Sequence, residues 1–155
     1  MRVGRYLFLS LCAALISCAT TAPVQSWDYK TLSSRPTPED WKPGSVWTFV
    51  IADRSGKSQT LTFRLSDEVA QTCMPGDWRK LDQIAGAPRV FAGVAARAAY
   101  KADGSFLWVS LNSNWCDVND DIRGELAGAA FKGERSMGGA TGSSQVGTVR
   151  GWRVR

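Results

Sequence analysis

The densest group of side chains with oxygen atoms of the kind that bind a metal falls within five consecutive positions: Asp117, Asn119, Asp120 and Asp121. Oxygen ligands at alternating positions are what calcium-binding loops use. Counted from Asp117, however, Ile122 stands where an EF-hand loop needs glycine, and Gly128 stands where the closing glutamate belongs. We therefore expect a solvated turn here and no metal site.

Histidine is absent from all 155 residues. A Ser-His-Asp or Cys-His arrangement cannot be built, and neither can the usual histidine-containing zinc site. General acid–base chemistry by carboxylates needs only Asp or Glu, but no pair of acids stands out in the sequence. We therefore predict that the protein is not an enzyme and needs no cofactor.

The first residues have the parts of a secretory signal. Arg2 and Arg5 precede an apolar run from Tyr6 to Ser17, and small residues end it. The run is shorter than the ~20 residues of a membrane-spanning helix. We expect an exported protein that has lost this segment, including Cys12.

The end of this segment, Leu15-Ile16-Ser17-Cys18, resembles the lipobox of bacterial lipoproteins. The resemblance implies that residues 1–17 form the signal peptide. Cys18 then carries acyl chains of the palmitate kind and becomes the first residue of a membrane-anchored chain. Ala19 resembles an outer-membrane address, because this class uses Asp there for inner-membrane retention, so we expect the periplasmic face of the outer membrane. The alternative is an ordinary cut after Ala19, which leaves a soluble periplasmic protein.

Two cysteines remain after the signal, Cys73 and Cys116. An isolated pair in an oxidising periplasm is expected to form a disulfide bond, and only one pairing is available. A metal pair or a redox pair is disfavoured, because there is no CxxC spacing and no further soft ligand.

Charge argues against nucleic acid as a partner. Without Arg2 and Arg5 the chain carries 17 Lys and Arg against 14 Asp and Glu, a net charge of +3, which is weak and scattered. Cations gather only at the end, at Arg150, Arg153 and Arg155. They are either a solvated strand face or a contact to an acidic partner or lipid head group.

Composition divides the mature chain into two parts. Residues 18–44 hold the lipidated cysteine and a Pro- and Ser-rich tether, whose last part we expect to pack onto the domain. Residues 45–155 form one small domain that reads as short strands with turn signals between them. The segments expected to be strands are 46–51, 60–65, 79–84, 95–101, 106–111, 122–126, 131–137 and 146–154, with a Gly-rich loop at Gly138 to Ser144. For 79–84 a short helix is the alternative.

About eight strands with local connections predict an all-β, antiparallel up-and-down meander that closes into a small barrel and so removes its edges. The glycine-punctuated segments Gly124-Glu125-Leu126, Phe131-Lys132-Gly133 and Gly147 to Trp152 resemble the final strands of lipocalin- and calycin-type barrels. This resemblance covers the last third of the chain and implies a fold only.

Tryptophans supply both core and surface candidates. Trp47, Trp108 and Trp152 lie on predicted strands, where we expect them to fill the core. Trp78 and Trp115 lie in turns near the two cysteines. They either cover the disulfide or form an exposed platform for a partner.

These features together predict a membrane-anchored envelope lipoprotein with a non-catalytic binding role. We expect it to dock a periplasmic protein, as inhibitors and immunity lipoproteins do, with Trp78, Trp115, Arg150 and Arg153 as candidate partner-binding residues. The alternatives are a carrier of a small apolar ligand in the barrel mouth and a structural envelope-assembly lipoprotein.

Overall fold

The computed structural model describes residues 38–154, and of Phe91 it describes only the backbone. The predicted signal, Cys18, most of the tether and Arg155 lie outside the described residues. The elements are η1 (Glu39–Trp41), β1 (Val46–Asp53), β2 (Ser58–Val69), β3 (Arg79–Ala85), β4 (Val90–Phe91), β5 (Val94–Ala95), β6 (Ala98–Asp103), β7 (Phe106–Ser110), β8 (Val118–Ala127), β9 (Ala130–Gly139) and β10 (Gly142–Arg153).

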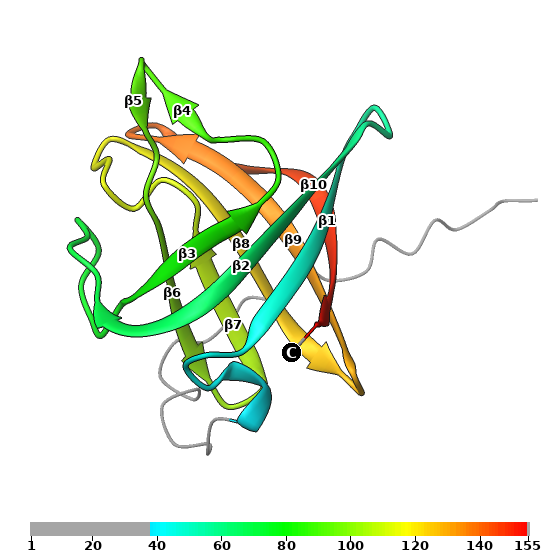
Figure 1. Cartoon of the computed structure of the whole chain (residues 1–155). Coiled ribbons are helices and arrows are strands. Elements are labelled where there is room, and N and C mark those ends of the chain that lie inside the picture. The colour runs from blue at the N-terminus through cyan, green and yellow to red at the C-terminus, as the bar shows by residue number, and fades with distance from the viewer. Residues whose placement is uncertain (1–37, 155) are drawn as a thin grey trace, which may run out of the picture.

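Eight of these strands form one closed antiparallel barrel in the order β1-β10-β9-β8-β7-β6-β3-β2 (Figure 1). Neighbours in the barrel are consecutive strands, except that β4 and β5 form a separate two-stranded hairpin between β3 and β6 and that β1 and β10 close the barrel. The last strand pairs with the first, with Ile51 opposite Val149. The predicted all-β meander that closes on itself is thereby confirmed.

The β1–β2 hairpin shows why these residues become strands. Leu61, Phe63 and Leu65 are buried while the residues between them are more exposed, as expected for strands with one face inward. The turn is held by Asp53, whose carboxylate accepts hydrogen bonds from the backbone N–H groups of Ser55 and Lys57, at 2.8 and 3.0 Å. The hydrogen bonds of the turn and the two-residue alternation of buried side chains therefore both favour this hairpin.

Aromatic side chains fill the barrel interior. Trp47 and Phe49 of β1 and Phe131 of β9 are each fully buried. The rings of Phe49 and Phe131 meet edge to face with centroids 5.4 Å apart. Trp41 of η1 closes one end of the barrel, with its ring centroid 4.4 Å from that of Trp47. The end of the predicted tether therefore belongs to the core.

Glycines in the last three strands make room for this aromatic core. Gly124 and Gly133 are cross-strand partners, and Gly151 is the partner of Phe131 on the next strand. A Cβ atom at Gly133 would lie 2.5 Å from the carbonyl oxygen of Arg123 and 2.8 Å from the Phe131 ring. The glycine pattern of the final strands thus reflects a close approach of backbone and ring.

Several sequence predictions are wrong in detail. Trp108 and Trp152 do not enter the core: Trp108 is opposite Arg123 on the outer face, and Trp152 is 47% exposed. Successive side chains of a strand point to opposite faces of the sheet. The residue before each of these tryptophans in sequence faces into the barrel, so the tryptophan itself points outward. The expected Gly-rich loop from Gly138 to Ser144 is mostly strand, because β9 and β10 extend to within two residues of each other.

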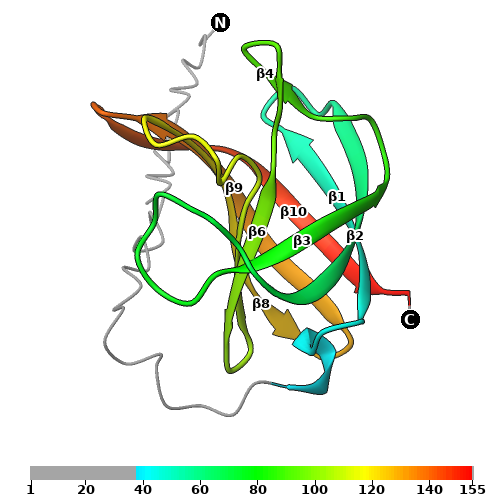
Figure 2. The ribbon, with the colours of Figure 1, turned by 60° about the vertical axis from the view of Figure 1, so that its left-hand side comes forward.

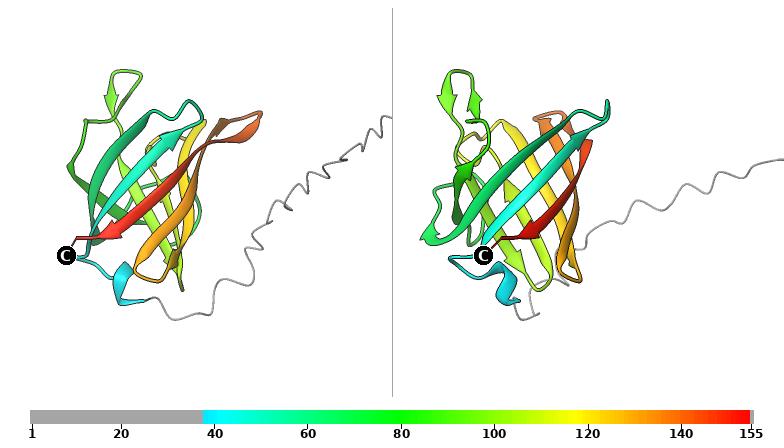
Figure 3. Two further views of the ribbon diagram at one scale, coloured as in Figure 1. Left: turned by 90° about the vertical axis from the view of Figure 1, so that its right-hand side faces the viewer. Right: turned by 45° about the vertical axis from the view of Figure 1, so that its right-hand side comes forward.

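The two ends of the barrel differ. One end holds η1, the turns after β6 and β8, and the C-terminal end of β10, while the β4–β5 hairpin stands off the opposite end (Figures 2 and 3). We call the first the closed end, because Trp41 fills it, and the second the mouth. Within the described residues, no helix is long and apolar enough to cross a membrane.

Candidate functional site

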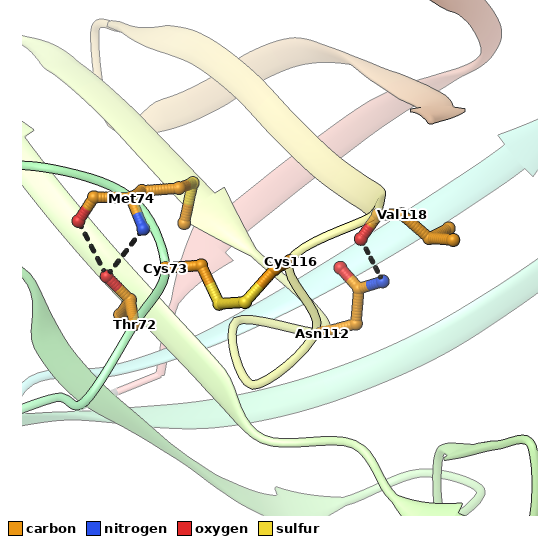
Figure 4. The surroundings of a disulfide bond; sticks show 6 residues. All are labelled: Thr72, Cys73, Met74, Asn112, Cys116 and Val118. Atoms are coloured by element: carbon orange, nitrogen blue, oxygen red, sulfur yellow. Dashed lines mark hydrogen bonds between the residues drawn. A yellow bond between two sulfur atoms is a disulfide. The ribbon is translucent and has the colours of Figure 1, made fainter. Parts of the chain in front are cut away.

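The predicted disulfide between Cys73 and Cys116 is present, with Cα atoms 5.3 Å apart. It joins the segment after β2 to the β7–β8 loop (Figure 4). Thr72 Oγ1 donates to the carbonyl oxygen of Met74 at 2.8 Å on one side of the bond, and Asn112 Nδ2 donates to the carbonyl oxygen of Val118 at 2.9 Å on the other. The disulfide therefore joins two loops that are each held by their own hydrogen bonds.

Trp78 follows the disulfide-bound segment and is only 1% exposed. Its ring packs edge to face on Trp108, with centroids 5.1 Å apart, and its indole N–H donates to the carbonyl oxygen of Pro75 at 3.2 Å. The guanidinium of Arg123 lies 3.9 Å from the centre of the Trp108 ring. Trp78 therefore has no exposed face for a platform, while Trp115 is half-buried.

Asp121 lies on the outer face of the barrel beside this cluster and is 2% exposed. Burial raises the pKa of its carboxyl group, and this effect outweighs the opposing charge of Arg123 and the hydrogen bonds from Trp108 and Ser110. The Arg123 Nη2 to Asp121 Oδ2 distance is 3.2 Å. Arg123 and the hydrogen bonds consequently offset only part of the free-energy cost of burying the Asp121 negative charge.

Asp120, the preceding residue of β8, points into the barrel at the mouth. Its two carboxylate oxygens accept hydrogen bonds from Nε and Nη2 of Arg135, at 2.7 and 2.8 Å, and one of them also accepts from Arg89 Nη2. The Asp120 side chain is 5% exposed, and each arginine side chain is 17% exposed. Burial by itself would raise the pKa of Asp120, but the two arginines more than offset it and lower that pKa. We call these three residues the mouth triad.

The triad corrects our expectation for the acidic cluster. Asp120 and Asp121 lie on a strand with their side chains on opposite faces, and both are buried, so a solvated turn is wrong for them. Asp117 is exposed in the loop before β8. Among residues 38–154 no three His, Cys, Asp or Glu side chains group so that they can hold a metal ion. The acidic side chains therefore serve separate ion pairs.

A cavity of about 310 Å³ opens beside the mouth triad. Asp120, Arg89 and Arg135 are all among the residues that line it. Most of the remaining lining is apolar: Ala87, Pro88, Val90, Ala96, Val118 and Met137, with Gln59 and Asn112 beside them. Sequence reasoning missed this site, although Arg135 gave one signal, because it is a charged residue in step with the inward-facing Phe131 and Gly133.

The end of β10 carries an exposed patch on the outer face. Trp152 is 47% and Val154 51% exposed, and Arg150 and Lys132 are outward cross-strand partners beside them. We call these four residues the β10 patch. Arg153, which the sequence proposed as a partner contact, forms an ion pair with Asp40 at 3.2 Å.

The class that the fold defines is a small closed all-β barrel. No protein-family model matches the sequence, and the searches of curated proteins and of solved structures give no significant match. The observations that bear on function are therefore the geometry of the described residues and the sequence of the N-terminal segment.

Proposed function

We propose that this protein is a lipid-anchored outer-membrane lipoprotein of the bacterial envelope, whose barrel, of lipocalin-like shape, docks a periplasmic protein without catalysis. The anchor is argued from Leu15-Ile16-Ser17-Cys18. The docking role is argued from the β10 patch. The observation that supports it most is Trp152, since it is the one aromatic side chain more than a third exposed among those that the structure describes.

The chemistry of the β10 patch favours an acidic protein surface. Tryptophan and arginine are the residues that most often contribute large shares of binding free energy at interfaces. Arg150 and Lys132 lie directly opposite each other across two strands, so their like charges lie close together beside Trp152. A partner that places carboxylates over both cations and an apolar group over the indole ring would relieve that repulsion and bury the ring.

The barrel interior argues against the carrier alternative. Its centre and its closed end are occupied by aromatic side chains that each have 1% or less of their surface exposed: Trp41, Trp47, Phe49 and Phe131. A lipocalin-type carrier needs an open apolar volume at that place. Docking on the outer surface needs no such volume, so it is the function we favour.

The test is a crosslinked pull-down of the lipidated protein from its own cell envelope, read by mass spectrometry. We expect one stoichiometric protein partner. Trp152→Ala and Arg150→Glu should each reduce its recovery about tenfold or more, whereas Ile84→Ala should not. Ile84 is a matched control because it is also 47% exposed and lies on a different strand, β3.

Equal recovery with Trp152→Ala and Ile84→Ala would refute docking through the β10 patch. Protein docking would also be refuted if the pull-down yields no protein partner while the protein binds anionic lipid vesicles. If Arg150→Glu abolishes that vesicle binding, the β10 patch contacts lipid. The anchor is tested separately: Cys18→Ala should move the protein from the membrane fraction to the soluble fraction, and retention in the membrane would contradict lipidation.

A further inference from the structure

The mouth of the barrel holds more positive than negative charge in a half-enclosed space. Two guanidinium groups, Arg89 and Arg135, face the single carboxylate of Asp120. The hydrogen bonds that Arg135 donates to Asp120 raise the pKa of Arg135, and the negative charge of Asp53 raises it further by a smaller amount. Asp53, however, is exposed and is already engaged by Ser55 and Lys57. The cavity lining itself therefore carries one net positive charge.

Hydrogen-bond donors remain unused at this place. Arg135 uses Nε and Nη2 on Asp120, and Arg89 uses Nη2. Nε of Arg89 is fully buried, and no residue of the described part of the chain accepts a hydrogen bond from it. Because this nitrogen is closed to solvent, the donors that a ligand can reach are the other N–H groups of the two guanidiniums, which each carry five donors and which both line the cavity.

We propose that the cavity beside the mouth triad binds a small carboxylate that bears a short apolar group. The planar guanidinium fork of arginine matches carboxylate geometry. A monoanion balances the one net positive charge, whereas a dianion such as phosphate leaves an excess negative charge beside Asp120. The apolar lining, which includes Val90, Val118 and Met137, accommodates the hydrocarbon part.

The size of the cavity limits the ligand. A volume of about 310 Å³ lies at the lower end of the ~300–1,000 Å³ range of ligand pockets. The interior below it is filled by the aromatic core, so a long hydrocarbon chain has no path deeper into the barrel. The carboxylate therefore comes either from a free small molecule or from the C-terminus of a polypeptide chain placed at the mouth.

The site is independent of the proposed docking surface. Arg89 directly precedes β4, which stands off the mouth, whereas Trp152 belongs to the C-terminal end of β10, which lies at the closed end (Figures 1 and 3). A failure of the β10 patch in the pull-down would leave this inference intact, and the reverse also holds.

The test is isothermal titration of the purified protein at pH 7 with four probes: hexanoate, its neutral counterpart hexanamide, N-acetylvaline and inorganic phosphate. We expect saturable binding of hexanoate, of N-acetylvaline or of both, with dissociation constants of about 1 mM or below. Binding of hexanoate alone assigns a free small molecule, and binding of N-acetylvaline alone assigns a polypeptide C-terminus. Hexanamide and phosphate should bind much more weakly.

Two substitutions separate a binding site from a purely structural ion pair. Arg89→Gln should weaken binding of the carboxylate about tenfold or more while Asp120 keeps both hydrogen bonds to Arg135. Arg97→Gln is the control, because Arg97 is exposed and lines a different hollow. Asp120→Asn removes the competing internal anion and should tighten carboxylate binding about tenfold or more, a gain that a merely structural role would not produce.

The inference is wrong if neither carboxylate gives saturable binding, if hexanamide binds as tightly as hexanoate, or if Arg89→Gln and Arg97→Gln bind the carboxylate equally well. Thermal unfolding of each variant confirms that it is folded under the titration conditions. If Asp120→Asn is unfolded, the comparison of Arg89→Gln with Arg97→Gln decides the question alone.

Discussion

Replacing Asp120 with Asn should destabilise the barrel, while the same change at its neighbour Asp121 should not. Asp120→Asn leaves the guanidinium groups of Arg89 and Arg135, each 17% exposed, without their counter-charge. Breaking a buried ion pair by removing one partner costs ~3–5 kcal/mol. Because both arginines reach solvent in part and Asn keeps one acceptor oxygen, we expect the lower end, about 3 kcal/mol. For a domain of this size that corresponds to a fall in Tm of ~12 °C.

The pH dependence of stability provides an independent check, because the two pKa shifts have opposite signs. The folded-state pKa of Asp120 is lowered, so its contribution to stability is present above the unfolded-state pKa of ~3.9 and is lost as the pH falls through the folded-state value. The folded-state pKa of Asp121 is raised, so its ionisation opposes folding once the pH exceeds the unfolded-state value. Asp121→Asn mimics the protonated form and should be neutral or stabilising at pH 7.

The assay is urea unfolding followed by tryptophan fluorescence between pH 3 and pH 8, with the disulfide intact. Wild-type protein should lose free energy of unfolding toward acid, and Asp120→Asn should show a smaller loss. If Asp120→Asn costs less than ~1 kcal/mol at pH 7, the triad behaves as a solvent-screened surface pair. If Asp121→Asn is the more damaging substitution, our assignment of the two carboxylates is refuted.

Three further perturbations test the fold. Gly133→Ala places a methyl group against the Phe131 ring and should cost ~1–3 kcal/mol or more, whereas Lys132→Ala on the outward face should not; equal Tm values would contradict the close approach. Removing both cysteines at 73 and 116 opens a loop with a sequence separation of 43 and should cost about 4 kcal/mol in the chain-entropy model; free thiols in non-reducing mass analysis would refute the bond. Trp41→Ala should cost ~3–5 kcal/mol, since Trp41 is 1% exposed, and an unchanged urea midpoint would exclude it from the core.

Local pattern predicted the hairpins well, because strand alternation and turn chemistry are encoded within a few residues. The segments 46–51 and 60–65 fall within β1 and β2, and 131–137 falls within β9. Where the pattern was ambiguous the prediction was less accurate. The segment 95–101 is divided between β5 and β6. The backbone N–H of Ala96 donates to the carbonyl oxygen of Arg89, in the loop before β4, and pairing with the barrel strand β3 begins only at Ala98.

The direction of tryptophan side chains was not predictable from hydrophobicity alone. Trp47 faces inward and Trp152 outward, although both lie on strands that pair with each other. In a closed barrel each strand has one inward set, and Gly151 occupies the inward position beside Phe49, where a larger residue has no room. The neighbouring Trp152 is therefore directed to the surface.

The sequence by itself determined the all-β meander, the pairing of Cys73 with Cys116 by elimination, and the absence of histidine chemistry. These depend on local periodicity and on counts of residue types. Only the tertiary structure decided that Arg89 and Arg135 meet on Asp120, and that Asp121, one residue away, serves a separate cluster. The folded barrel brings together Arg89 from a loop, Asp120 from β8 and Arg135 from β9, although they are far apart in sequence. Side-chain alternation along β8 directs Asp120 and Asp121 to opposite faces, although they are adjacent in sequence.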